Sequence, residues 1–166
     1  MCSSDLENIS VRRTVVLETS GVLGAYVHGT RIGALVALEG GSASLAHDLA
    51  MHVAASNPRY LSAAQVPPEV VAKEREILAE QASKEGKSPE IIAKMIEGRL
   101  RKSLNEIVLL GQPFVKDPEQ TVEKLLKSAG STVLRIERFE VGAGIEKKQS
   151  DFVAEVMAQV SAAGGR

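Results

Sequence analysis

Histidine is the side chain best suited to chemistry near neutral pH, and the sequence has three histidines, His28, His47 and His52. His47 and His52 stand five positions apart in a predicted helix, which puts them on different faces, and no acidic or cysteine partner has zinc-ligand spacing. His28 stands alone in a short glycine-containing break, either as an exposed turn residue or as part of a functional surface. The histidines predict no metal site and leave the role of His28 open.

Motifs for nucleotide binding and hydrolysis are absent from the sequence. No Gly-x-x-x-x-Gly-Lys-Ser/Thr loop could hold phosphates, and Gly142-Ala143-Gly144 lacks the third glycine and the strand-to-helix setting of a dinucleotide site. A serine paired with His28 would lack a Gly-x-Ser-x-Gly context. The sequence therefore predicts no cofactor and no enzymatic activity, and an unrecognised small enzyme would need a polar constellation that we do not find.

The composition is typical of a globular protein that chooses its partners locally. Hydrophobic residues make up 44% of the chain and aromatic residues only 3%, so the core must be aliphatic and base stacking is disfavoured. The net charge of -1 gives no general attraction to nucleic acid or to anionic membranes. The single cysteine, Cys2, permits no internal disulfide, and no apolar run reaches the length of a membrane span. We expect a soluble cytoplasmic protein with neither nucleic acid nor membrane as a partner.

A β-hairpin over residues 21–39 is the element on which the predicted core is built. Two β-prone runs flank His28-Gly29-Thr30-Arg31, and a short glycine-containing break between such runs is typical of a hairpin. The second run, residues 32–38, is apolar at nearly every position, as in a central strand. β-branched residues predict another strand over residues 9–19, and alternating polar and apolar residues predict one over 131–141.

Two helices are predicted to pack on this sheet. The first begins at Ser42 or Ser44, whose hydroxyl can cap it, and ends before Pro58, because proline disfavours the helical conformation of the preceding residue. The second begins at Asp117 or Thr121 and ends at Gly130.

Residues 69–85 and 89–104 predict two long amphipathic helices. Between them, Gly86, Ser88 and Pro89 are typical of a helix end, an N-cap and a first helical position. We expect a helical hairpin that projects from the core. Its apolar stripes either form the seam between the two helices or leave surplus surface for a homodimer through residues 69–104.

Two further segments could face a partner. In Gln112-Pro113-Phe114-Val115 the proline stiffens the chain, and Phe114 and Val115 lie either in the core or on a partner. Behind the break at residues 142–144, residues 151–162 predict a short helix with one apolar face. That face must dock on the protein's own core or on another protein.

These elements predict an α+β protein: a small antiparallel sheet covered by helices, with a protruding antiparallel helical hairpin and a C-terminal helix. The predicted divisions are 1–58 for the first part of the core subdomain, 59–106 for the helical-hairpin arm, 107–144 for the second part of the core subdomain, and 145–166 for a C-terminal helical module.

Several segments of the chain carry a resemblance to a known family. They are Glu-Asn-Ile-Ser-Val-Arg-Arg (7–13), Tyr-Val-His-Gly-Thr-Arg-Ile-Gly (26–33), Ala-Met-His-Val-Ala-Ala-Ser-Asn-Pro (50–58), Glu-Gly-Arg-Leu (97–100), Gly-Gln-Pro-Phe-Val (111–115), Arg-Phe-Glu-Val-Gly (138–142) and Ser-Asp-Phe-Val (150–153). In this order, over about residues 7–160, the sequence resembles bacterial elongation factor Ts, the guanine-nucleotide exchange factor for elongation factor Tu.

The resemblance implies partner contacts at two places. By position, the hairpin tip and the segment after Gln-Pro-Phe match family residues that contact a β-barrel domain of elongation factor Tu, and the C-terminal helix matches one that grips the nucleotide domain. The residues carried over are His28, Gly29, Val115 and Lys116 for the barrel, and Asp151, Phe152 and Val156 for the nucleotide domain.

The chain also departs from the family's pattern. Full-length members begin with a small helical domain and a further core subdomain, whose Thr-Asp-Phe-Val loop disturbs the magnesium and phosphate site of the partner. Neither precedes residue 7, and residues 150–153 match the family's C-terminal helix instead of that loop. We expect an exchange factor weakened by the missing parts, or alternatively a helical-arm interaction or dimerisation module without exchange activity.

Overall fold

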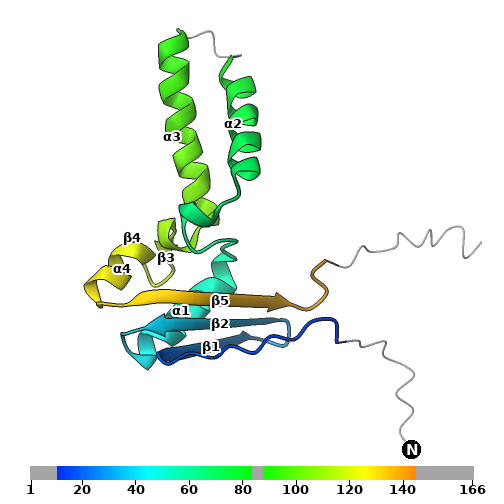
Figure 1. The fold of residues 1–166 in the computed structure, drawn as a ribbon, viewed down its shortest axis with the longest axis vertical. Helices are drawn as coiled ribbons and strands as arrows, with labels where there is room; N and C mark the ends of the chain where they lie inside the picture. Colours follow the sequence, from blue (N-terminus) through cyan, green and yellow to red (C-terminus); the bar gives the residue numbers. More distant parts are fainter. Residues whose placement is uncertain (1–10, 84–87, 145–166) are drawn as a thin grey trace, which may run out of the picture.

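The computed structural model describes residues 11–83 and 88–144. Its centre is a three-stranded antiparallel sheet in the order β1-β2-β5. The strands are β1 (Val22–His28), β2 (Ile32–Glu39) and β5 (Thr132–Glu140). One helix lies against a face of this sheet, and a pair of helices projects away from it (Figure 1). The helices are α1 (Ala43–Ser56) on the sheet, and α2 (Pro68–Ser83) and α3 (Pro89–Ile107) in the arm.

The predicted fold class is confirmed: an α+β protein with a small antiparallel sheet, a helical cover and a protruding helical hairpin. The predicted hairpin over residues 21–39 is present as β1 and β2, joined by a three-residue turn with His28 opposite Ile32. Gly29 has a φ of +57°, a left-handed conformation that glycine adopts without the penalty of a side chain. The predicted C-terminal helix at residues 151–162 lies outside the described residues.

Strand β2 is the central strand of the sheet, as its nearly continuous apolar sequence predicts. It pairs with β1 on one side and with β5 on the other, where the register shifts between Ala37 and Leu38. Its side chains on the α1 side enter the core, and Ala37 on the opposite side is only 2% exposed. A strand covered on both faces favours apolar side chains, and in β2 only the terminal Glu39 is exposed.

Helix α1 begins and ends where local chemistry predicts. The Ser42 hydroxyl accepts a hydrogen bond from the Leu45 N–H at 3.2 Å, and Asn57 ends the helix in a left-handed conformation. The helix approaches β1 so closely that a Cβ on Gly24 would lie 2.1 Å from the Ala46 carbonyl oxygen. Glycine at position 24 therefore sets the distance between helix and sheet.

The core is aliphatic and is shared between the sheet, α1 and the segment after the arm. Among the described residues, Phe114 is the aromatic side chain buried within it, and Tyr26 packs against it partly buried. Its buried residues are Ala34, Val36, Leu38, Ala46, Leu49, Ala50, Val53, Ala54, Leu109, Phe114, Val122 and Leu126. Contributions from both sides of the arm make the core one unit, because residues before position 58 and after position 107 pack on each other.

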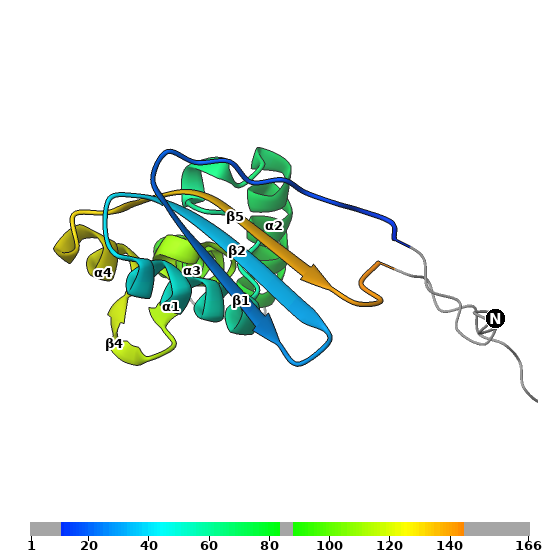
Figure 2. The ribbon, with the colours of Figure 1, turned by 90° about the horizontal axis from the view of Figure 1, so that it is seen from below.

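The predicted strand over residues 9–19 is wrong for the described part, since residues 11–19 form no strand. They run in an extended path on the face of the sheet opposite α1 (Figure 2). The Arg13 guanidinium stacks over the Phe139 ring at 5.0 Å, and Arg12 donates a hydrogen bond to the Ala143 carbonyl at 2.8 Å. β-branched residues favour an extended backbone, but a strand also needs a free sheet edge, and this segment lies across a face.

The segment that follows the arm folds into short elements. They are the 3-10 helix η3 (Leu109–Gly111), the strands β3 (Pro113–Phe114) and β4 (Asp117–Thr121), and the helix α4 (Val122–Ser128). Of the two predicted helix starts, Thr121 is correct, because its hydroxyl accepts a hydrogen bond from the Lys124 N–H. Asp117 instead begins β4, which pairs with β3 in a separate two-stranded sheet.

The arm is anchored by two chain segments that lie side by side at its base. Tyr60 forms an isolated parallel bridge with Val108, and the Leu109 and Leu110 N–H groups donate to the carbonyls of Tyr60 and Leu61. A short 3-10 helix, η2 (Ala63–Gln65), leads into α2. Ser88 is the N-cap residue of α3, as predicted, although its side chain makes no capping hydrogen bond. Within the described ranges, no helix combines the length and apolar character needed to cross a bilayer.

Candidate functional site

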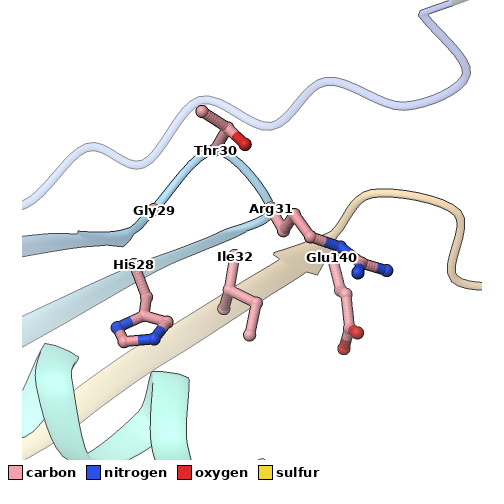
Figure 3. Close-up of a pocket in the computed structure, with 6 residues that line it drawn as sticks. All are labelled: His28, Gly29, Thr30, Arg31, Ile32 and Glu140. Carbon is pink, nitrogen blue, oxygen red and sulfur yellow. The ribbon is translucent and has the colours of Figure 1, made fainter.

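The tip of the β1–β2 hairpin presents an exposed histidine beside a shallow cavity. His28, Ile32 and Glu140 point to the same side of the hairpin, whereas Thr30 points to the other side (Figure 3). Together with Gly29 and Arg31 they line a cavity of about 390 Å³. The tip therefore combines an apolar surface with an imidazole and a carboxylate, a combination suited to contact with another macromolecule.

Aromatic side chains hold His28 from the helix side. The Tyr26 hydroxyl lies 3.3 Å from Nδ1 of His28, and the two rings are stacked with centroids 6.2 Å apart. Tyr26 also meets His47 of α1 edge-on at 5.7 Å, and Nδ1 of His47 donates a hydrogen bond to the Ala25 carbonyl at 2.9 Å. This cluster restrains the exposed imidazole without burying it.

The segment after Gln112 divides its side chains between core and surface. Phe114 is 5% exposed and packs in the core, whereas the next residue, Val115, is 45% exposed. The Lys116 ammonium forms an ion pair with the Asp48 carboxylate of α1 at 2.6 Å, although its side chain stays half exposed. Phe114 therefore lies in the core, and Val115 and Lys116 remain on the surface.

His52, which is fully buried in α1, holds this segment from beneath. The Val115 N–H donates to Nδ1 of His52 at 3.2 Å, and Nε2 of His52 lies 3.0 Å from Oε1 of Gln112. The Gln112 amide nitrogen donates to the Glu106 carbonyl at 2.6 Å, so its oxygen faces the imidazole. Nε2 of His52 must therefore carry the proton and donate it to Oε1 of Gln112, because Nδ1 accepts the hydrogen bond from the Val115 N–H.

Burial lowers the pKa of His52, because desolvation disfavours the imidazolium more than the hydrogen bond with Gln112 favours it. The neutral ring fits the geometry, since a proton on Nδ1 would point at the Val115 N–H. Among the described residues, every buried polar side-chain atom has a hydrogen-bond partner. A neutral His52 is thus built into the packing of α1 against the loop.

Helix α1 brings the two predicted partner-facing segments into one unit. His47 contacts the hairpin, Asp48 pairs with the loop, and His52 holds the loop backbone one turn later. In the part of the chain that the structure describes, no group of three or more His, Cys, Asp or Glu side chains could hold a metal ion. The arrangement leaves exposed side chains on two segments that α1 holds in place.

A family model described as elongation factor TS matches residues 4–143, which is most of the chain. The chain belongs to the elongation factor Ts family. It is 58% identical over 154 residues to an elongation factor Ts of Francisella tularensis subsp. novicida, covering 93% of this chain and 53% of that protein. An elongation factor Ts of Methylococcus capsulatus is 57% identical over 157 residues, covering 94% of this chain and 54% of that protein. The chain thus spans about half the length of the curated relatives it matches.

The structure places four of the residues that resemblance to elongation factor Ts singles out in two exposed segments, each of which contacts α1. His28 and Gly29 are exposed at the hairpin tip, and Val115 and Lys116 are exposed on the loop that α1 holds. Their contact with a partner remains a prediction. The other residues carried over, Asp151, Phe152 and Val156, lie outside the described residues.

Sequence reasoning missed the residues that hold these segments in place. It weighed His47 and His52 as metal ligands and placed His52 on the apolar face of its helix, but it found no partner for either and gave Asp48 no role. A usable signal was present, because a histidine on an apolar helix face and a glutamine at the end of an apolar run both need partners when buried. That rule would have suggested that His52 and Gln112 pair, although not which other groups they meet.

Proposed function

We propose that this chain acts as part of an elongation factor Ts: it binds elongation factor Tu and promotes the exchange of GDP for GTP. The observation that carries the proposal is the exposure of His28 and Gly29 at the hairpin tip and of Val115 and Lys116 on the loop, two segments that both contact α1. These residues match family positions that contact a β-barrel domain of the partner. Binding, and no covalent chemistry of the chain itself, is the proposed mode of action.

Exchange by such a factor is a coupling between two binding equilibria. Suppose a protein binds the nucleotide-free partner more tightly than it binds the nucleotide-bound partner. The affinity of the partner for nucleotide then falls by the ratio of those two binding constants. Contacts on a β-barrel domain supply affinity, whereas distortion of the nucleotide site requires contacts near that site. The chain spans about half the length of the curated relatives it matches, so it holds only part of the contacts that a full-length relative can make. We therefore propose that this chain binds the partner but accelerates nucleotide release less than a full-length family member.

Two measurements on the whole chain test this proposal. Gel filtration with nucleotide-free elongation factor Tu tests binding, and co-elution is the expected result. Stopped-flow release of a fluorescent GDP from elongation factor Tu tests exchange, and we expect acceleration below that of a full-length elongation factor Ts measured alongside. Rates equal to the full-length factor would contradict the expected weakening, and failure to co-elute would contradict binding.

A second candidate function, self-association through the arm, is favoured by exposed apolar side chains. Leu78, Ala82 and Leu100 are buried in the arm, but Ile77 is 42% exposed and Ile91 is 51% exposed. A groove of about 700 Å³ runs beside α2 and is lined mainly by small and apolar residues. Surplus apolar surface of this kind favours a second copy of the chain as occupant. Light scattering at increasing concentration distinguishes the dimer that this function requires from a monomer.

A further inference from the structure

The loop that carries Val115 and Lys116 is held to α1 by polar contacts that the core does not need. A phenylalanine or leucine at position 52 would fill the same interior without two polar atoms that require partners. The imidazole instead accepts from the backbone N–H of a residue whose own side chain is exposed. Burying the two ring nitrogens of His52 is unfavourable unless Gln112 and Val115 stay in place as hydrogen-bond partners. The conformation of His52 and that of the loop therefore stabilise one another.

We propose that His52 is a positioning residue for partner binding: through Nδ1 it fixes the backbone at Val115, and so presents Val115 and Lys116 in their binding arrangement before the partner arrives. The proposal rests on the proposed function for its role in binding, but its structural part can be measured without a partner. Pre-ordering a contact segment raises affinity, since less conformational freedom is lost on association.

The charged groups around the loop support this arrangement. Asp48 precedes His52 by one helical turn and pairs with Lys116, so one face of α1 holds two consecutive loop residues, one by its backbone and one by its side chain. Phe114, between Gln112 and Val115, packs against the His52 ring with the two centroids 5.9 Å apart and the planes tilted by 33°, and so holds the loop from the core side. The loop is thus restrained on both sides of the exposed Val115 side chain.

Three variants separate positioning from a general contribution to stability. His52→Phe keeps an aromatic ring but removes both polar atoms. His52→Asn is the rescue variant, because its side-chain oxygen can take the place of Nδ1 as acceptor for the Val115 N–H. Val53→Ala is the matched control: Val53 is the next residue of α1, fully buried, and makes no hydrogen bond to the loop in the part of the chain described.

The first readout is amide hydrogen exchange at Val115 in the free protein, together with the nitrogen NMR signature of the His52 tautomer. We expect a neutral ring with the proton on Nε2 in the wild type. Val115 should exchange at least about tenfold faster in His52→Phe, recover in His52→Asn, and change no more than its neighbours in Val53→Ala. A proton on Nδ1, or an unchanged Val115 rate in His52→Phe, would overturn the proposal whether or not the partner binds.

The second readout is affinity for nucleotide-free elongation factor Tu. His52→Phe should weaken binding about five- to tenfold, the range expected when one ordering hydrogen bond is lost, while His52→Asn stays near the wild type. If the wild type binds and His52→Phe binds equally well, or if Val53→Ala loses as much affinity, His52 does not position the loop for binding. If the wild type does not bind at all, the proposed function fails. The amide hydrogen-exchange measurement then decides by itself whether His52 orders the loop.

Discussion

Replacement of His28 by alanine separates a binding role from a structural one. His28 is exposed at the hairpin tip, and its side chain meets that of Tyr26 through a 3.3 Å approach of the hydroxyl and a stacked ring. If it contacts elongation factor Tu, the substitution should weaken binding and leave the fold intact. If it serves the fold, stability should fall instead.

The expected size of each effect follows from this environment. Exposed substitutions usually change the free energy of unfolding by less than about 0.5 kcal/mol. For a chain of this length 1 kcal/mol shifts the melting temperature by roughly 2–4 °C, so His28→Ala should move it by less than about 2 °C. A contact residue at an interface costs about 1–2 kcal/mol when truncated, which corresponds to roughly a five- to thirtyfold loss of affinity.

The assay pairs calorimetry of the free protein with titration of nucleotide-free elongation factor Tu. Val27→Ala is the matched control, because Val27 is 70% exposed and neighbours His28, but consecutive strand residues point to opposite faces. We expect the control to bind like the wild type. A drop in melting temperature of several degrees in His28→Ala, with unchanged affinity, would refute the reasoning and make His28 a structural residue.

Three further predictions concern stability and assembly. The pKa of His52 lies below its ordinary value of 6.5, so the folded protein should be most stable with respect to this group above pH 6.5. Below that pH the free energy of unfolding should fall by up to about 1.4 kcal/mol per pH unit, because the unfolded chain binds the proton more readily. Urea unfolding at several pH values should show this slope in the wild type and not in His52→Phe. Gly24→Ala should cost about 1–3 kcal/mol because its Cβ would meet the backbone of α1, whereas Gly33→Ala, with nothing within 4 Å, should be nearly neutral; equal melting temperatures would contradict this packing. If the arm forms a dimer, Ile77→Glu and Ile91→Glu should each yield a monomer by light scattering, and a dimer that survives both would place its interface elsewhere.

Local patterns account for the elements that the sequence predicted correctly. The hairpin, α1, the arm helices and β5 each follow from periodicity, from a glycine at a turn, or from a capping residue within a few positions. Ser42 and Thr121 both act as caps because a hydroxyl and the amide it meets are neighbours in the chain. Such contacts join residues close in the sequence and do not depend on the tertiary structure, so they can be predicted from sequence.

Predictions failed where an element depended on what lay beside it. Residues 11–19 have the composition of a strand, but they cross the face of a sheet and find no edge to pair with. Asp117, one of the two predicted helix starts, instead begins β4, which pairs with β3. Backbone propensity limits the local conformation of a segment, whereas the strand with which it pairs depends on the whole fold.

The sequence by itself determined the fold class, the arm and the family to which the chain belongs. Only the tertiary structure decided that His28 and the Val115 loop share the support of α1, and that His52 reaches a glutamine sixty positions later. These contacts follow no period along the chain, because each joins residues that become neighbours only when the core closes. A histidine on an apolar helix face predicts that its ring will need hydrogen-bond partners, but the tertiary fold determines which groups they are.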